Sequence, residues 1–390
     1  MRVLITTLPA VGHFHPLVPI ARALVLAGHE VLVAASASFQ SYISAAGLVG
    51  ISAGPDWLAS EPLVRRTFPE IGASVDAAAQ RYVMSHIFCG VHARAMMKDI
   101  LDMAENWLPD IIMREVWEFG GLLAARVLKI PCVLHGIGQW RNNEDIYDIG
   151  GGELEDLCDA VHLRRQNLSL GDRDLYIDPC PPSLQLPTRR PYPTLSHGIR
   201  PIAPDEVSPG ATVPVWRWGA SERPVVYVSL GTVMNHRAGI LETIVAGLHS
   251  VVADVAVSVG PGRSPDELGT QPPHVHVDSY VPFSHLAEKA ALVICHGGWS
   301  TVIGALAKGV PVVCVPMAAD NFSNARSCEA TGVGLTVRPE ELTSQAIRSA
   351  AEEVLGEENF RRAARRIRAE IAGMPMPWQA AAAVGALKGL

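Results

Sequence analysis

Short apolar runs alternate with helical patterns along most of this chain, and that alternation constrains the fold more than any other feature. The first apolar run is "RVLITTL" (residues 2–8), and a stretch with helical spacing of apolar residues follows from Leu17 to Val25. Gly28 ends that stretch, and a second apolar run, "EVLVAAS" (residues 30–36), begins directly afterwards. A strand, a helix and a strand within about 35 residues predict a βαβ unit, whose parallel strands are buried on both faces.

The same rhythm recurs later in the chain and is interrupted once. Residues 179–224 are crowded with proline and have little periodicity, so they are interpreted as an extended interdomain connection. From "PVVYVSLGT" onward the strand–helix alternation resumes and continues into C-terminal helices. The predicted fold class is therefore α/β, with two Rossmann-like, doubly wound parallel-sheet domains facing across a cleft. In such sheets, ligands bind beyond the carboxyl ends of the strands.

Composition excludes several classes of protein. The chain has 390 residues, and with 48% hydrophobic and 18% charged residues it can bury a large core. Its formal net charge of −7 argues against a nucleic-acid partner, and no apolar stretch reaches the ~20 residues of a membrane span. The seven cysteines are scattered and form no C-x-x-C, so they are interpreted as reduced core residues of a cytoplasmic protein. The N-terminus is interpreted as a first strand and not as a signal peptide.

A histidine follows the first predicted strand. In "GHFH", His13 lies beyond the strand's carboxyl end and at the start of a helix, where the helix dipole favours a neutral imidazole. A neutral imidazole in a cleft can act as a general base for a hydroxyl. The alternative is that His13 only caps the helix. His15 could form a metal pair with His13, but no carboxylate nearby in the sequence completes it, so no metal site is expected.

A second cluster of polar groups lies at residues 296–301, "HGGWST", where an apolar run ends and a helix begins. Backbone N–H groups at a helix N-terminus bind anions, and glycines let a phosphate approach the main chain. Ser300, Thr301 and His296 add further donors. A tight strand–helix turn with side-chain capping is the alternative. The chain has neither G-x-G-x-x-G after a strand nor a P-loop motif, so a dinucleotide or P-loop nucleotide site is not supported.

A carboxylate and an amide follow the later strand "VPVVCV". Asp320 and Asn321 offer an acceptor beside a donor, a combination that suits the hydroxyls of a sugar. A helix cap explains the same residues equally well.

The order of these elements closely resembles the GT-B glycosyltransferases that decorate natural products, over almost the whole chain. The resemblance rests on Gly-His after strand one, "VSLGT", "SYVPF", "HGGWST" and "GVPVVCVPMAADNFSNA", in that order. The chain looks most similar to actinomycete enzymes that attach deoxysugars to macrolide and enediyne polyketide antibiotics. The resemblance implies an N-terminal acceptor-binding domain (1–205), a donor domain (206–372) and a last segment (373–390) that packs back on the N-terminal domain.

The resemblance also implies roles for individual residues. His13 would deprotonate the acceptor, and its acidic partner would be Glu115, in "PDIIMRE", where the family more often has Asp. Tyr280 would stack on the base, at a position where the family usually has Trp, and Val281 would bind the base through its backbone. Asp320 and Asn321 would hold sugar hydroxyls. The diphosphate would be bound by Thr232, His296, Gly297, Gly298, Ser300 and Thr301.

One departure from the family bears on the nucleotide. UDP-sugar enzymes of this family often carry a Glu that binds both ribose hydroxyls, at the position of Gly304 here. A bidentate carboxylate needs both hydroxyls, and thymidine lacks one of them. The glycine therefore favours a dTDP-sugar, although it would also allow close helix packing.

Taken together, these features predict an inverting, metal-independent transfer of a (deoxy)sugar from a dTDP-sugar to a hydroxyl of a polyketide-type aglycone, with no cofactor. A homodimer is the default expectation. The alternatives are a UDP-sugar-dependent lipid or sterol glycosyltransferase, a sugar-nucleotide epimerase and a non-catalytic helper protein. Five aromatic residues could form an apolar acceptor wall, although core packing explains each of them as well: Trp57, Phe68, Phe88, Trp140 and Tyr147.

Overall fold

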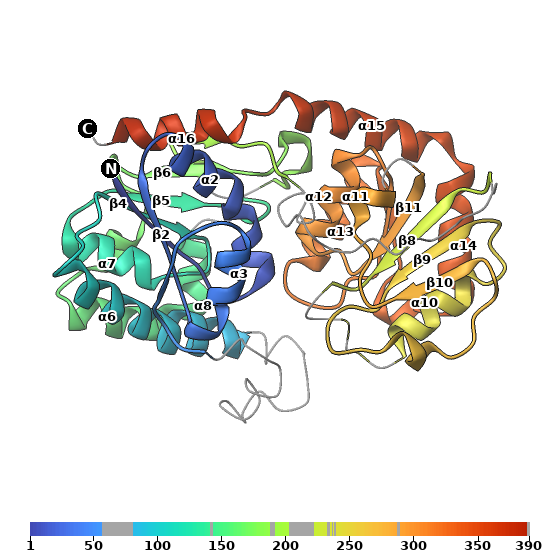
Figure 1. The fold of residues 1–390 in the computed structure, drawn as a ribbon, viewed down its shortest axis with the longest axis horizontal. Coiled ribbons are helices and arrows are strands. Elements are labelled where there is room, and N and C mark those ends of the chain that lie inside the picture. The colour runs from blue at the N-terminus through green and yellow to red at the C-terminus, as the bar shows by residue number, and fades with distance from the viewer. Residues whose placement is uncertain are drawn as a thin grey trace. The chain divides into compact units, whose positions relative to one another are not determined.

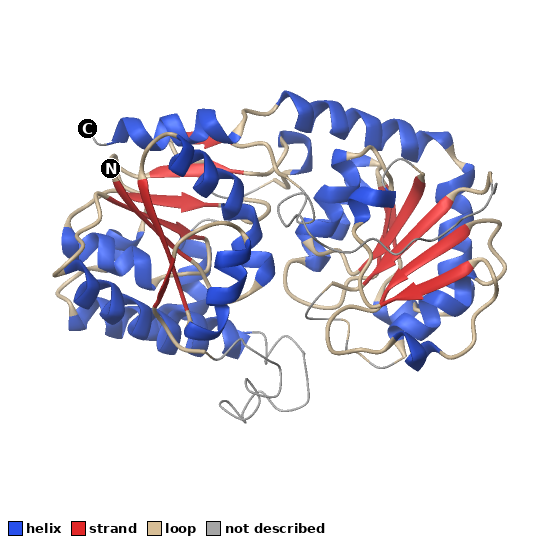
Figure 2. Cartoon of the chain, in the orientation of Figure 1, coloured by secondary structure: helices blue, strands red, loops and turns tan. Residues whose placement is uncertain are grey.

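A computed structural model of the chain describes residues 1–56, 81–140, 143–187, 192–202, 222–231, 235, 237, 239–286 and 289–387. The contacts divide the chain into two compact units, each built on an all-parallel sheet (Figure 1). One unit comprises Met1–Cys180, Pro187–Pro201 and Met374–Leu390, and the other comprises Pro181–Leu186 and Ile202–Gly373. Helices lie on both faces of each sheet, as expected for doubly wound α/β domains (Figure 2).

The first sheet has seven strands in the order β3-β2-β1-β4-β5-β6-β7, all paired in parallel. The order reverses between β1 and β4, which makes the carboxyl ends of these two strands the switch point where ligands bind. The strands are β1 (Arg2–Thr6), β2 (Glu30–Ala35), β3 (Gly50–Ser52), β4 (Ile111–Glu115), β5 (Cys132–His135), β6 (Leu175–Asp178) and β7 (Ser196–Gly198).

Helices of the first unit cover that sheet. The helix α2 packs on α16 and α6 packs on α7, while α8 packs on the π-helix η4 (Figure 1). Pro16 stands in a 3-10 turn between α1 and α2, as its missing N–H allows. The helical elements described in this unit are α1 (Val11–Phe14), η1 (His15–Leu17), α2 (Val18–Leu26), η2 (Ala37–Phe39), α3 (Gln40–Ala45), η4 (Val83–His92), α6 (Ala93–Ala104), α7 (Gly120–Leu128), α8 (Asn143–Ala160), η5 (Arg165–Leu168) and α16 (Pro377–Ala386).

The second sheet has six parallel strands in the order β10-β9-β8-β11-β12-β13, so its switch point lies between β8 and β11. Valine and isoleucine fill these strands because both faces of the sheet are covered; β9, for example, is buried along its whole length. The strands are β8 (Val225–Ser229), β9 (Asp254–Ser258), β10 (Val275–Asp278), β11 (Ala290–Cys295), β12 (Val312–Cys314) and β13 (Gly334–Thr336).

The apolar core of the second unit lies between its sheet and the paired helices α10 and α14, and α12 packs on α13 and α15. The helical elements described in this unit are η6 (Pro182–Leu184), α10 (Ile240–Leu248), η7 (Pro265–Leu268), α11 (Phe283–Leu286), α12 (Trp299–Ala307), α13 (Asn321–Thr331), η8 (Pro339–Glu341), α14 (Ser344–Gly356) and α15 (Glu358–Gly373).

The proline-rich stretch differs from the sequence prediction of a plain connection. Residues 196–198 form β7, whose residues pair in parallel with β6 and extend the first sheet. The preceding segment Pro181–Leu186 groups with the second unit, where the Ser327 hydroxyl donates a hydrogen bond to the Leu184 carbonyl. Three paired residues leave no room for a readable alternation, so β7 had no signal in the sequence.

Two further sequence expectations concern membranes and cysteines. Across the described residues, no helix is both long enough and apolar enough to cross a bilayer. All seven cysteines are buried and free.

Candidate active site

The carboxyl ends of β1 and β4 bring together the two residues that the sequence analysis paired. His13 lies in α1, just beyond β1, and Glu115 is the last residue of β4. The Nδ1 atom of His13 lies 3.1 Å from Oε1 of Glu115. The Glu115 carboxylate is completely buried, and its Oε2 accepts a hydrogen bond of 2.7 Å from the Trp117 N–H. A carboxylate held in this way can orient an imidazole and stabilise its protonated form.

A second histidine stands beside this pair and stays neutral. His92, the last residue of η4, is fully buried. Burial, reinforced by the neighbouring His13, lowers the pKa of His92 to about 3. A positive charge at His13 therefore meets no competing cation from His92 near neutral pH.

An apolar surface borders His13. The Phe88 ring packs edge-on against the His13 ring at 6.3 Å between centroids, and Trp117 lies 6.2 Å from Phe88. Both aromatic residues belong to a small cluster around the buried side chains of Leu8 and Ile87. Phe88 is carried by η4, a π-helical stretch, and π-helical turns are frequent at functional sites. Sequence reasoning missed Trp117, which had no signal beyond its place two residues after Glu115.

Of the other predicted acceptor residues, the structure describes the side chain of Trp140. Trp140 is 6% exposed and packs against Tyr176 and Tyr192, at ring distances of 4.6 and 5.5 Å, within the main core of the unit. Its environment fits core packing and not an open wall. Tyr147 falls within α8, but its side chain lies outside the described part of the chain, as do Trp57 and Phe68.

In the second unit, Gly298 of "HGGWST" and Gly231, from outside that motif, lie against the His296 ring. A Cβ atom at Gly298 would lie 2.2 Å from Nε2 of His296, and a Cβ at Gly231 would lie 2.7 Å from its Cε1. Gly231 and Gly297 also have φ angles of +75° and +79°, which favour glycine. The imidazole thus packs against two bare Cα atoms, and this explains why more than one glycine is needed here.

The electrostatics of His296 keep it neutral. Burial lowers the pKa of His296 to about 4, although the Asp320 carboxylate and the Ser229 carbonyl oppose the shift. Near pH 7 the ring is therefore a neutral donor or acceptor. It stands at the start of α12, where helix geometry leaves the N–H groups of Trp299 and Ser300 without a partner in their own helix. Such a helix start binds anionic oxygens.

The loop before α13 is tied to the same glycines. The Asn324 amide donates 2.9 Å hydrogen bonds to the Gly297 carbonyl and to Oδ2 of Asp320. Ala319, just before Asp320, has a φ of +52°, which is uncommon for a residue with a side chain and is found at functional sites. Asn321 is 4% exposed, and its Oδ1 accepts from the backbone of Ala318. Asp320 is partly exposed, whereas the side chains of Asn321 and Asn324 hold the loop in place.

Tyr280 and Val281, the residues predicted to bind the base, differ in their surroundings. The Tyr280 side chain is 50% exposed. The Val281 N–H already donates to the Ser258 hydroxyl at 2.7 Å, and the Val281 carbonyl accepts from the Tyr227 hydroxyl at 3.1 Å. The Val281 N–H is therefore already engaged. A base could bind the Val281 backbone only through the second lone pair of its carbonyl oxygen. Thr232 lies outside the described residues.

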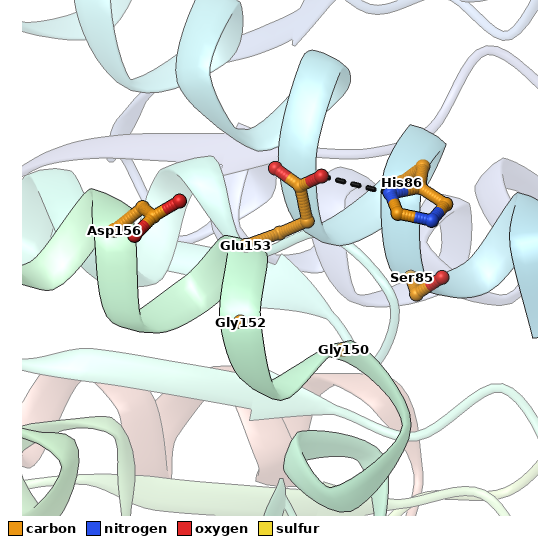
Figure 3. A pocket seen from close by; sticks show the side chains of 6 residues that line it. All are labelled: Ser85, His86, Gly150, Gly152, Glu153 and Asp156. Atoms are coloured by element: carbon orange, nitrogen blue, oxygen red, sulfur yellow. Dashed lines mark hydrogen bonds and ion pairs between the residues drawn. The ribbon is translucent and has the colours of Figure 1, made fainter.

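A pocket of about 400 Å³ in the first unit does not contain these residues. Figure 3 shows His86 on η4 facing Glu153 on α8, with Nδ1 and Oε1 2.8 Å apart. Both side chains are partly exposed, and such pairs contribute about 0–1 kcal/mol. The pocket thus lies at the solvent-exposed contact between η4 and α8. Its lining residues are Ser85, His86, Gly150, Gly152, Glu153 and Asp156.

Metal ligands do not gather in the described parts of the chain. Among those residues, no group of three or more His, Cys, Asp or Glu side chains is placed to hold a metal ion. The polar stretch "GDRD" (residues 171–174) could suggest a metal-binding D-x-D, but Asp174 is 4% exposed and pairs with Arg126.

Comparison with known proteins agrees with this geometry. Residues 22–231 match the family described as erythromycin biosynthesis protein CIII-like, N-terminal domain, and residues 242–387 match the C-terminal domain of the same description. The L-demethylnoviosyl transferase of Streptomyces niveus is 30% identical, over 97% of this chain and 96% of that protein. The 10-deoxymethynolide desosaminyltransferase of Streptomyces venezuelae is 28% identical, over 97% of this chain and 95% of that protein.

A solved structure extends the likeness to the whole fold. The crystal structure of the glycosyltransferase VinC in complex with dTDP superposes with a TM-score of 0.81 at 25% identity, covering 100% of both chains. Both sheets, the site residues and these matches lead to one conclusion: the chain is a glycosyltransferase of GT-B fold that belongs to the erythromycin biosynthesis protein CIII-like family of natural-product enzymes.

Proposed function

We propose that this enzyme transfers a (deoxy)sugar from a dTDP-sugar to a hydroxyl of a polyketide-type aglycone, with inversion at the anomeric carbon and without a metal ion. The observation that carries the proposal is the 3.1 Å approach of His13 to the buried carboxylate of Glu115, which makes His13 suited to take a proton. The proposal assigns the acceptor to the first unit and the donor to the second.

In the acceptor step, His13 acts as the general base. With Nδ1 directed at Glu115, the proton of the acceptor hydroxyl goes to Nε2 as the oxygen attacks the anomeric carbon. The imidazolium that forms is stabilised by the Glu115 carboxylate. Phe88 and Trp117 offer an apolar wall to the aglycone. A single displacement of this kind inverts the anomeric carbon, because attack and departure occur on opposite faces.

In the donor step, the start of α12 stabilises the departing diphosphate. The backbone N–H groups of Trp299 and Ser300, the side chains of Ser300 and Thr301, and the neutral His296 supply donors there. Preorganised donors of this kind contribute about 3–4 kcal/mol each to transition-state stabilisation. Asp320 accepts hydrogen bonds from sugar hydroxyls, and Tyr280 stacks on the thymine.

The proposed metal independence of the transfer can be tested directly. Because helix-end N–H groups and hydroxyls offset the diphosphate charge, we expect turnover in excess EDTA to equal turnover in added Mg²⁺. Initial rates of sugar transfer, measured with and without chelator, check this expectation. A strict need for Mg²⁺ would instead mean that a cation, and not α12, carries the charge of the leaving group.

The nucleotide preference gives a second test. Gly304 lies buried in α12, at the position where UDP-sugar enzymes of the family often carry a carboxylate for the ribose. We therefore expect dTDP to raise the melting temperature more than UDP does at equal concentration, because a tenfold difference in Kd corresponds to about 1.4 kcal/mol. Differential scanning fluorimetry over a range of nucleotide concentrations measures it. Equal or larger shifts with UDP would contradict the dTDP assignment.

A further inference from the structure

The most unusual residue near the proposed catalytic pair is the arginine that precedes Glu115. Arg114 lies on β4, its side chain has 0% exposure, and it heads the largest fully buried side chains of the described chain. A buried guanidinium is strongly unfavourable unless hydrogen bonds and opposite charges compensate for its lost water. Its contacts therefore show what the fold gains from keeping it.

One nitrogen of Arg114 donates hydrogen bonds to the backbone carbonyls of the turn that follows β4. Its Nη1 atom lies 3.2, 3.1 and 3.1 Å from the carbonyl oxygens of Glu115, Val116 and Glu118, to which it donates. The guanidinium also lies over the Phe119 ring, 5.0 Å from its centroid. The turn of residues 115–118 is thus wrapped around a single cation.

The far end of this turn is fixed to β1. The Glu118 carboxylate accepts hydrogen bonds from the N–H groups of Gly120 and Gly121, at 2.6 and 2.8 Å, and from the Thr6 hydroxyl. Thr6 is the last residue of β1 and the ladder partner of Arg114. Since β1 leads to His13 and β4 ends at Glu115, this contact joins the two strands that carry the proposed pair.

We propose that Arg114 is a positioning residue, which holds the 115–118 turn so that the Glu115 carboxylate faces His13. This inference rests on the proposed function, in which His13 and Glu115 act together. The Trp117 N–H that fixes Oε2 of Glu115 belongs to the same turn, so the direction of the carboxylate follows from the turn's conformation. Without the guanidinium, three carbonyls would lose their common donor and the turn could open.

The charges around the turn are consistent with this role. Among the described residues, the ionisable groups that face this turn are those of His13 from α1, His92 from η4, Cys89 and Cys132, together with Arg114, Glu115 and Glu118. Burial lowers the pKa of His92, so this side chain is neutral near pH 7. Burial raises the pKa values of the Cys89 and Cys132 thiols, so both stay protonated. Burial also raises the pKa of Glu118, and Arg114 opposes that rise.

The test is the pH profile of Arg114→Lys. Lysine keeps the charge but offers no planar fork, so the turn should loosen and Glu115 should lie farther from His13. We expect kcat to fall by up to about 100-fold, the loss that a misplacement of about 1 Å can cause, with the KM for the donor unchanged. The base acts when neutral, so activity falls as pH drops through its pKa. A neighbouring carboxylate raises the pKa of such a base. Moving the Glu115 carboxylate away should therefore shift the acid limb of the kcat/KM profile to lower pH.

Arg126→Lys is a matched control. Arg126 is also largely buried, donates to the carbonyls of Asn167 and Ser169, and pairs with Asp174, all away from His13. It should lower the melting temperature but leave the acid limb in place. If Arg114→Lys likewise lowers stability and leaves the acid limb unmoved, Arg114 is only a structural residue and the inference is overturned. If it folds poorly, Thr6→Val, which removes one contact of Glu118, should give a smaller shift in the same direction.

Glu115→Gln separates this inference from the proposed function. If Glu115→Gln leaves the acid limb unmoved, the pairing of His13 with Glu115 has no catalytic role and the proposed function fails. If Glu115→Gln moves the limb and Arg114→Lys does not, only the inference fails. If both variants move the acid limb, the double variant should show no shift beyond that of Glu115→Gln, because Arg114 acts through Glu115.

Discussion

Replacing His13 with alanine should lower kcat for sugar transfer by about 10²- to 10⁴-fold, the range lost when a general base is removed. The reason is the position of the imidazole beside the Glu115 carboxylate, at 3.1 Å. Binding of dTDP should change little, because its proposed contacts all lie in the second unit. Initial rates and the thermal shift produced by dTDP measure the two effects separately. Equal loss of transfer and of nucleotide binding would remove His13 from the chemistry.

A companion substitution shows whether the loss is chemical. Glu115→Gln keeps the size of the buried side chain and its acceptor oxygen but removes its charge. It should lower kcat less than His13→Ala does, since the base remains in place. The melting temperature of each variant, measured without ligand, shows how much of any loss comes from unfolding.

Replacing Gly298 with alanine should abolish donor binding. The new Cβ would lie 2.2 Å from Nε2 of His296, and Gly231 on another side of the ring leaves it little room to move away. Overpacking of this kind costs about 1–3 kcal/mol of stability. We expect a melting temperature lower by several degrees, no thermal shift with dTDP, and transfer at background level. Thermal shift and calorimetric titration with dTDP check the result.

Two further variants identify the cause. His296→Ala should restore the stability of Gly298→Ala, because it removes the atoms that clash, but it should not restore transfer. Gly356→Ala is the matched control, since Gly356 ends α14 and a Cβ there meets nothing within 4 Å. If Gly298→Ala binds dTDP with normal affinity, the start of α12 is not the diphosphate site.

Much of the fold follows from local sequence, for a physical reason. Strands such as "VLIT" and "VVYVS" are buried on both faces, so they are continuous apolar runs that can be recognised without the rest of the chain. The predictions at His13, His296 and Asp320 rest on the rule that ligands of such folds bind where strands end, and this rule needs only the order of the elements.

The contacts that shape the sites could not be predicted in the same way. The bond between Thr6 and Glu118 joins residues 112 positions apart, and no periodicity links them. Asp174 belongs to the polar stretch "GDRD" (residues 171–174), yet its side chain is buried against Arg126 from α7. Tyr227 and Ser258 occupy the backbone of Val281 through bonds that depend on the register of β8 and β9. In each of these cases the surroundings of the residue depend on contacts with residues far away in the sequence.

The course of the chain limits how parts of this enzyme can be exchanged with relatives. The last helix, α16, packs on α2, and the Pro375 carbonyl accepts from the Arg200 N–H, so the final residues belong with the first ones. A transplanted second unit should therefore stop near Gly373 and leave α16 with its original host. Residues 181–186 should travel with that unit, because Ser327 holds them. Chimaeras cut only once, in the proline-rich stretch after residue 200, would separate both pairs of partners.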